Sequence, residues 1–517
     1  MRSYIDHLES PEKKANFYGV FRAAAIFPAI EKPGISTRIL FMGYWMIKRN
    51  IHEIGRVATL RTKEGKLLRR TYEAIREPRA FRVEVRDLLP QELQDQDFEG
   101  SLEVEFFSSS QLVFPYPAAV INYYGPAFST VVHTAQRVYN NFEDRANNSE
   151  TQVRESGFNL YELQGVSSFV SLVNGPVALK GQTLDIEAIN WKNETKKGSI
   201  PLGDLKPYEM FWIYPGKALN LEAFFEGKTG ACKLDFEVDW IFPRLVAGNE
   251  QQSPPSLSIT HTYYDCSEAT SPKDYWHEES PLFHPTSLMV PLDLSTEAFT
   301  NVYFYPIYSP SHFAIDLEIY DRTGNRVFEK KDILHIGKNK EPYQKISFKD
   351  FGLPPDQYGG RLIARRLDEN PIPSRIKVAL DVGFKNPLTP CNICTNLQPY
   401  TAKIEGKKSS FKWAPVLADQ PRCSLWLLNT SPEKAFDRPA TIDLKFHREE
   451  DNHILERPTI LPPHGFIDIE IQNDPELKSF FGNKVGWASL VTTNPFLSTY
   501  YFAIHPESGC VGGDHGF

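Results

Sequence analysis

Cysteine and methionine are scarce in this chain of 517 residues, which holds 6 Cys and 5 Met. So few cysteines exclude the dense disulfide framework of small secreted domains. The chain also lacks any apolar run near the roughly 20 residues that a membrane-spanning helix needs, so no membrane span is expected. Its net charge of −8 lacks the basic excess that nucleic-acid binding requires, and nucleic acid is therefore not an expected partner.

Targeting and catalytic signals are missing as well. The first nine residues lack the basic-then-apolar order of a secretory signal, so a cytoplasmic location is the default expectation. The sequence contains no G-x-S-x-G elbow, no H-E-x-x-H, and no glycine-rich loop for a phosphate or a dinucleotide. An enzyme is therefore not the leading hypothesis.

Aromatic residues and proline are abundant, with 35 Phe, 23 Tyr, 8 Trp and 39 Pro. This composition favours strands and turns, because aromatic side chains suit strands and proline is excluded from helix interiors. Most of the aromatic side chains are expected to fill cores. Their flat apolar faces and polar edges would also suit sugar rings or a partner's surface, so carbohydrate and a protein partner are the two expected ligand classes.

The chain repeats itself at an interval of roughly 125 residues. Residues 370–381 align without a gap on residues 494–505, and residues 129–134 resemble residues 258–262. A period this long describes whole small domains, because a solenoid repeat has roughly 20–50 residues. Several domains are also expected from the length alone.

Each copy contains short strands of alternating polarity around polar turns, as in residues 315–320 and the turn 321–325. About seven such strands per 110–130 residues is typical of an antiparallel β-sandwich. We therefore predict an all-β fold of four tandem sandwich units, immunoglobulin-like or jelly-roll-like, with little helix. Residues 11–25 are the best helical candidate. The predicted units are 1–148 with an N-terminal extension, 149–280, 281–396, and 397–517 with a glycine-rich tail.

A polar residue recurs near the end of each copy, at His133, His261, Asp381 and His505. Side chains four apart on a strand share a face, which adds Asp265 to His261. The tail that follows His505 adds Asp514 and His515. These seven residues are the candidate binding residues. Imidazole and carboxylate groups also suit a divalent metal such as Zn, Fe or Ni, and the metal candidates among them are His261, Asp265, His505 and His515.

A simpler interpretation of the recurring residue is that it ends a strand at a domain junction, where it bonds to backbone. We favour this interpretation, because nothing in the sequence forces the copies together. No cofactor is therefore predicted, and a divalent metal remains the alternative.

A second metal candidate is the pair Cys391 and Cys394, a C-x-x-C motif in a proline-rich linker. A structural zinc site needs four ligands, and the second half-site is missing. We expect reduced thiols packed in that linker.

The sequence thus predicts a multidomain β-sandwich binding or structural protein whose ligand is carbohydrate or a protein partner. The alternative is a metal-dependent enzyme with a His/Asp site at a junction between units. Unpaired sheet edges would also suit assembly into a homo-oligomer.

Overall fold

The computed structural model describes residues 20–113, 116–140, 155–263, 275–276, 286–295, 297–305, 308–309, 312–337, 339–340, 343–368, 372–373, 376–385, 389–398, 404, 407, 410–433 and 435–517. The chain is mostly β, with 58% strand and 9% helix. The predicted all-β class with little helix is confirmed. None of the helices in this described part is both long and apolar enough to span a membrane.

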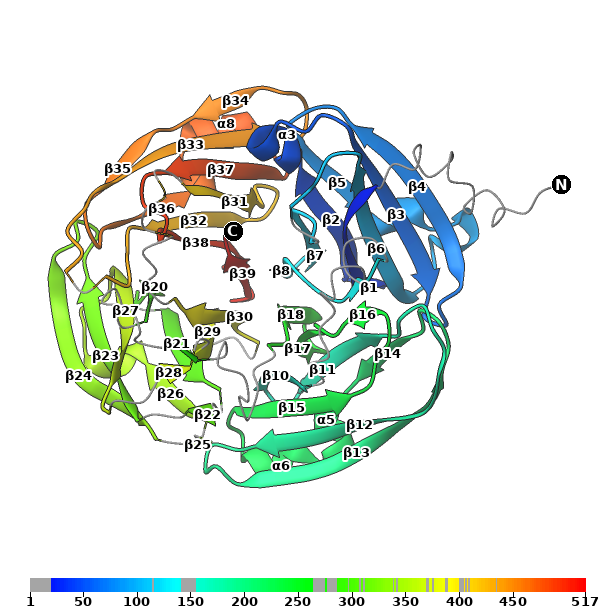
Figure 1. The fold of residues 1–517 in the computed structure, drawn as a ribbon, viewed down its shortest axis with the longest axis horizontal. Helices are drawn as coiled ribbons and strands as arrows, with labels where there is room; N and C mark the ends of the chain where they lie inside the picture. The colour runs from blue at the N-terminus through cyan, green and yellow to red at the C-terminus, as the bar shows by residue number, and fades with distance from the viewer. Residues whose placement is uncertain are drawn as a thin grey trace, which may run out of the picture.

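Four consecutive segments of the chain, here called units 1 to 4, share one sheet topology (Figure 1). Each unit has eight main strands in two antiparallel sheets. With these strands counted along the unit, the outer sheet has the order first, sixth, third, fourth. The inner sheet has the order fifth, second, seventh, eighth. The internal repeat of the sequence is therefore also a repeat of strand order.

The strands of units 1 and 2 are bounded as follows. Unit 1 contains β1 (Phe21–Glu31), β2 (Ser36–Met42), β3 (Ile54–Thr62), β4 (Leu67–Ile75), β5 (Ala80–Glu84), β6 (Phe98–Ser108), β7 (Ala119–Gly125) and β8 (Phe128–Val132). Unit 2 contains β10 (Glu155–Leu160), β11 (Val166–Val173), β12 (Leu179–Ile189), β13 (Thr195–Leu205), β14 (Met210–Ile213), β15 (Gly230–Phe236), β17 (Val246–Gln251) and β18 (Ser256–His261).

Units 3 and 4 repeat the same order. Unit 3 contains β20 (Ser287–Asp293), β21 (Ala298–Phe304), β23 (Phe313–Tyr320), β24 (Arg326–Ile336), β26 (Gln344–Ser347), β27 (Gln357–Arg366), β29 (Ile376–Phe384) and β30 (Cys391–Leu397). Unit 4 contains β31 (Ser410–Val416), β32 (Arg422–Leu428), β33 (Ala440–Arg448), β34 (Ile454–Glu456), β36 (Phe466–Glu470), β37 (Gly486–Thr492), β38 (Ser498–Ile504) and β39 (Val511–His515), and β35 (Thr459–Leu461) also pairs with β33.

Short helical segments carry the chain from the inner to the outer sheet between the fifth and sixth strands of every unit. They are α4 (Val85–Leu88) and η1 (Gln91–Leu93), α5 (Pro215–Leu219) and α6 (Leu221–Phe225), η4 (Phe348–Phe351), and η5 (Ile471–Asn473) and α8 (Pro475–Phe481). Helix α3 (Tyr44–Arg49) follows β2 in unit 1. The described residues also form three two-stranded pairs: β9 (Arg137–Val138) with β16 (Ile241–Phe242), β19 (Tyr275–Trp276) with β28 (Ile372–Pro373), and β22 (Tyr308–Ser309) with β25 (Asn339–Lys340).

Alternating polarity explains these strands. In β33, Ile442, Leu444 and Phe446 are buried, whereas Thr441 and Asp443 point to solvent. One face of the strand therefore fills the core while the other is hydrated.

The predicted helix over residues 11–25 is wrong for its described part. Residues 21–25 begin β1, which pairs with β6 along its whole length. The three alanines from Ala23 to Ala25 favour a helix locally, but all three are almost completely buried in the sheet. Tertiary pairing therefore overrides local propensity here.

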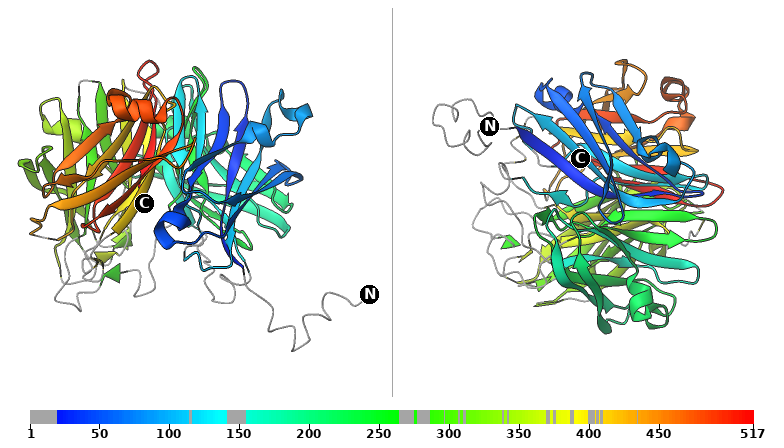
Figure 2. Two further views of the ribbon diagram at one scale, coloured as in Figure 1. Left: turned by 90° about the horizontal axis from the view of Figure 1, so that it is seen from above. Right: turned by 90° about the vertical axis from the view of Figure 1, so that its right-hand side faces the viewer.

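The four units form a closed ring in which unit 4 returns to unit 1 (Figure 1). From the side, the units lie at one level rather than stacked (Figure 2). One apolar cluster runs from unit 1 into unit 4 and includes Phe106 and Trp487. Another joins unit 3 to the inner sheet of unit 4, and a third, rich in tyrosine, lies between units 2 and 3. The pair β9 and β16 links units 1 and 2.

The eighth strands β8, β18, β30 and β39 meet at the centre of the ring, each packed against the eighth strands of its two neighbours (Figure 1). These are the edge strands of the inner sheets. Between β18 and β8, the Ile259 N–H donates to Thr130 Oγ1 over 3.0 Å. Between β30 and β39, Cys391 Sγ lies 3.5 Å from the Gly513 carbonyl oxygen. The inner edges are thus covered within the chain itself.

Candidate functional site

The ends of three eighth strands bring four candidate residues together at the centre of the ring. His133 directly follows β8, His261 ends β18, and β39 ends in Asp514 and His515. His133 Nδ1 lies 2.8 Å from Asp514 Oδ2. The His133 ring centroid is 5.0 Å from that of His261 and 4.8 Å from that of His515. Residues from units 1, 2 and 4 therefore share one cluster.

The hydrogen bonds of this cluster assign the tautomers of its rings. His261 Nδ1 lies 2.8 Å from the Thr262 carbonyl oxygen, and His515 Nδ1 lies 3.2 Å from that of Gly516. A carbonyl can only accept, so both nitrogens carry the proton and each Nε2 keeps a lone pair. The Asp514 carboxylate accepts from His133 and, through Oδ1, from the His515 backbone N–H over 2.8 Å.

Burial controls the charge of the cluster. It lowers the pKa of His515 to about 4 and holds the pKa values of His133 and His261 well below their usual range. Burial also raises the pKa of Asp514 to about 6. The imidazoles are therefore neutral near pH 7, which is the form that accepts hydrogen bonds or binds a metal.

A cavity of about 580 Å³, here called the central cavity, adjoins this cluster. It is lined by Tyr44, Lys48, Arg49, Tyr116, Pro117, Ala118, His133, Thr134, Arg244, Lys407, Ser410, Phe411, Trp413 and Phe517. Five of these residues are aromatic and four are lysine or arginine. No aspartate or glutamate is among these fourteen described residues.

Packing holds several of the lining side chains in place. Phe517 lies with its ring centroid 4.1 Å from that of His133 and 4.5 Å from that of Trp413. Two backbone hydrogen bonds between Trp413 and Phe517 also hold that segment, at 2.7 and 3.0 Å. This part of the cavity wall is therefore held by strand β31 and by the segment that follows β39.

The cations of the central cavity lie close enough to influence one another. Burial lowers the pKa of Lys48, and the like charges of Arg49 and Lys407 lower it further. The Lys48 ammonium lies 4.8 Å from the Phe411 ring centroid, and Arg244 Nη1 donates to Thr134 Oγ1 over 3.3 Å. The cavity therefore gathers positive charge beside aromatic faces.

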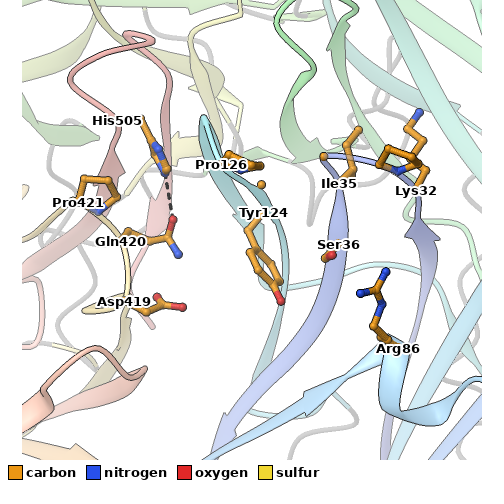
Figure 3. Close-up of a pocket in the computed structure, with 13 residues that line it drawn as sticks. Lys32, Ile35, Ser36, Arg86, Tyr124, Pro126, Asp419, Gln420, Pro421 and His505 are labelled. Atoms are coloured by element: carbon orange, nitrogen blue, oxygen red, sulfur yellow. Dashed lines mark hydrogen bonds between the residues drawn. The ribbon is translucent and has the colours of Figure 1, made fainter. Parts of the chain in front are cut away.

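His505 lies apart from the central cluster, in a second pocket of about 600 Å³ between units 1 and 4 (Figure 3). Its Nε2 lies 3.0 Å from Gln420 Oε1. Asp419 lines the unit 4 side of this pocket, while Lys32 and Arg86 line the unit 1 side (Figure 3). This second pocket thus mixes both signs of charge.

Asp381 lies in β29 and is also separate from the cluster. It is buried, and its carboxylate accepts hydrogen bonds from Tyr161 Oη of unit 2 and from Asn392 Nδ2. Asp381 and His505 thus belong to the seventh strand or its end, whereas His133 and His261 belong to the eighth. The four positions that align in the sequence lie in two different places in the unit.

Asp381 should make stability depend on pH. Burial raises its pKa from 3.8 to about 7, so the folded chain holds a proton that the unfolded chain releases between about pH 4 and 7. Stability contributed by this group therefore falls as pH rises through that window. We expect Asp381→Asn to remove this fall in stability. The measurement is the free energy of urea unfolding of variant and wild type, each at pH 5 and at pH 7. If the free energies of unfolding of variant and wild type differed by the same amount at both pH values, the raised pKa of Asp381 would be contradicted.

The cysteine pair is not in a linker, as predicted, but in strand β30. Both residues are buried, and neither forms a disulfide among the described residues. Residues three apart on a strand point to opposite faces, and Cys391 accordingly faces β39 while Cys394 packs in the tyrosine-rich cluster. Asp265 lies outside the described residues.

Sequence reasoning did not single out most of the central cavity, including Tyr44, Arg244, Trp413 and Phe517. These residues come from units 1, 2 and 4 and form no local motif. Only the abundance of aromatic residues pointed toward such a surface.

Comparison with known proteins assigns no family. No family profile and no curated protein sequence matches the chain. Among solved structures, a β-glucuronidase from glycoside hydrolase family 2 is similar over 47% of this chain and 24% of its own, at 10% identity and a TM-score of 0.11. A tetra-tandem repeat in the extending region of a large adhesion protein is similar over 96% of this chain and 99% of its own, at 8% identity and a TM-score of 0.10. Scores this low carry no argument about fold or ligand.

Proposed function

We propose that this multidomain β protein is a binding protein that holds an acidic carbohydrate in its central cavity. The observation that carries the proposal is the lining of that cavity, which combines aromatic faces with lysine and arginine and has no acidic residue among its described lining. A volume of about 580 Å³ lies within the range of small-molecule sites, about 300–1,000 Å³.

The two kinds of lining residue recognise different parts of such a ligand. Aromatic rings such as Trp413 and Phe517 offer flat apolar faces to the C–H face of a sugar ring. Arg244 and Lys48 offer donors to a carboxylate, and charge-assisted hydrogen bonds of this kind are about twice as strong as neutral ones. An acidic sugar uses both features, whereas a neutral sugar uses only the first.

Isothermal titration calorimetry with a uronic-acid disaccharide and its neutral counterpart tests the proposal. We expect the acidic disaccharide to bind at least 10-fold more tightly, because only it engages the cations. Arg244→Ala should weaken its binding at least 10-fold, the equivalent of about 1.4 kcal/mol. Lys48→Ala should act in the same direction.

The matched control is Lys197→Ala, which removes one positive charge from an exposed position on β13 of unit 2. This variant should bind like the wild type. Equal affinity for the acidic and the neutral disaccharide, binding of neither, or an equal loss in the control would overturn the proposal. Binding of neither sugar would favour a protein partner as the ligand.

A further inference from the structure

We propose that His133, Asp514 and His515 form a binding site for one divalent transition-metal ion at the ends of β8 and β39. One ligand atom from each residue lies within 4.8 Å of the other two. The site would join unit 1 to unit 4, because His133 belongs to the first unit and the other two residues to the last.

The separations suit a metal after a small adjustment. Zinc with bonds of about 2 Å in tetrahedral geometry holds its ligand atoms roughly 3.3 Å apart. The two ligand atoms that lie farthest apart, at up to 4.8 Å, would have to approach each other by about 1.5 Å. Rotation of the side chains allows a movement of this size. His133 and His515 are only partly buried, and His133 also lines the central cavity, from which an ion would reach the site.

Hydrogen bonds already orient two of the three residues, Asp514 and His515, as metal ligands. His515 donates its Nδ1–H to the Gly516 carbonyl, which leaves Nε2 for coordination. The His515 backbone N–H holds Asp514 Oδ1, and Phe517 packs against both imidazole rings. Partners of this kind fix the tautomer and direction of a ligating histidine. His261 packs edge-on against His133 and supports the site without belonging to it.

Two imidazoles and one carboxylate define the class of metal. This donor set suits zinc, and also iron(II) as a facial triad, whereas calcium and magnesium prefer oxygen ligands alone. Three protein donors leave at least one coordination position for an outside ligand. Because His133 also lines the central cavity, that position would lie near anything bound there.

The competing interpretation is that the hydrogen bond between His133 and Asp514 alone explains the cluster. In that case the residues join units 1 and 4 without any ion, and added metal has no effect. The two interpretations differ in stoichiometry, in spectrum and in the response to substitution.

The test is titration of the untagged full chain with Zn²⁺ and with Co²⁺ after dialysis against a chelator, with no sugar present. We expect one equivalent of Zn²⁺ by calorimetry, a rise in the thermal unfolding midpoint, and visible d–d bands from Co²⁺. Asp514→Asn and His515→Gln should each weaken Zn²⁺ binding at least 100-fold and abolish the Co²⁺ bands.

The matched control is His464→Gln, which changes a buried histidine of unit 4 that packs against Tyr320 and lies outside the cluster. It should bind one equivalent like the wild type. Absence of stoichiometric binding by the wild type, or wild-type binding by both cluster variants, would overturn the proposal. If Asp514→Asn does not fold, the Zn²⁺ and Co²⁺ titrations of His515→Gln still test the site. Since no sugar is present, the result is independent of carbohydrate binding.

Discussion

Replacing Gly512 with alanine should destabilise the protein by about 3 kcal/mol, at the upper end of the usual range for overpacking. A Cβ added at Gly512 of β39 would overlap the Ser129 carbonyl oxygen of β8 and lie 2.6 Å from the Thr130 Cα. These are backbone atoms, which cannot rotate away as a side chain can. The methyl group would therefore push units 1 and 4 apart at the centre of the ring. Urea unfolding of wild type and variant measures the loss.

A control separates this clash from the general effect of changing a glycine. Gly165 has a positive φ of 81°, and a Cβ added there meets nothing within 4 Å. Gly165→Ala should therefore lose only the cost of a left-handed backbone, about 1–2 kcal/mol. If the two variants lost the same stability, the close approach of β39 to β8 would not matter for folding.

Asp419→Ala should cost about 3 kcal/mol, because it removes the nearest counter-charge of a buried arginine and leaves only Glu84, whose Oε1 lies 4.0 Å from Arg38 Nη1. Arg38 is 1% exposed, and its Nη1 donates to Asp419 Oδ2 over 2.6 Å across the junction of units 1 and 4. Its Nε donates to Asn122 Oδ1 over 2.8 Å. The test is a double-mutant cycle. Urea unfolding gives the free energy of unfolding of the wild type, of the single variants Asp419→Ala and Arg38→Met, and of the double variant.

The double variant should recover most of the lost stability, since it removes the stranded charge together with its partner. Glu329→Ala is the control, because Glu329 pairs with Arg326 on the protein surface. That change should stay within about 0.5 kcal/mol. A double variant as unstable as Asp419→Ala would show that the charge pair is not the cause.

Much of the fold could be predicted because the relevant signals are local. Alternating polarity in a segment such as Ile442 to Phe446 depends on neighbouring residues, and it identified strands correctly. The order of those strands could not be predicted, because pairing of the first strand with the sixth joins residues as far apart as Phe21 and Ser108. The alanines of β1 were wrongly predicted to be helical for the same reason, because pairing with the distant strand β6 determines their structure.

The candidate site was predictable in its residues but not in its arrangement. His133, His261, Asp514 and His515 were all identified as candidates, and the structure brings them together. Alignment of similar short segments cannot tell the seventh strand of a unit from the eighth, which is why His505 was grouped with them. The cavity beside the cluster gave no sequence signal, because its walls come from three units.

The central meeting of the eighth strands has a consequence for symmetry. Four identical subunits around one axis would place the same residue at every junction, so that any site would occur four times. Here one chain supplies all four units, so the residues at one junction can differ from those at another. Units 1 and 4 meet through His133 and Asp514, whereas units 2 and 3 meet through Tyr161 and Asp381. Joining the units in one chain thus allows a ring of similar shapes to have different residues at its different junctions.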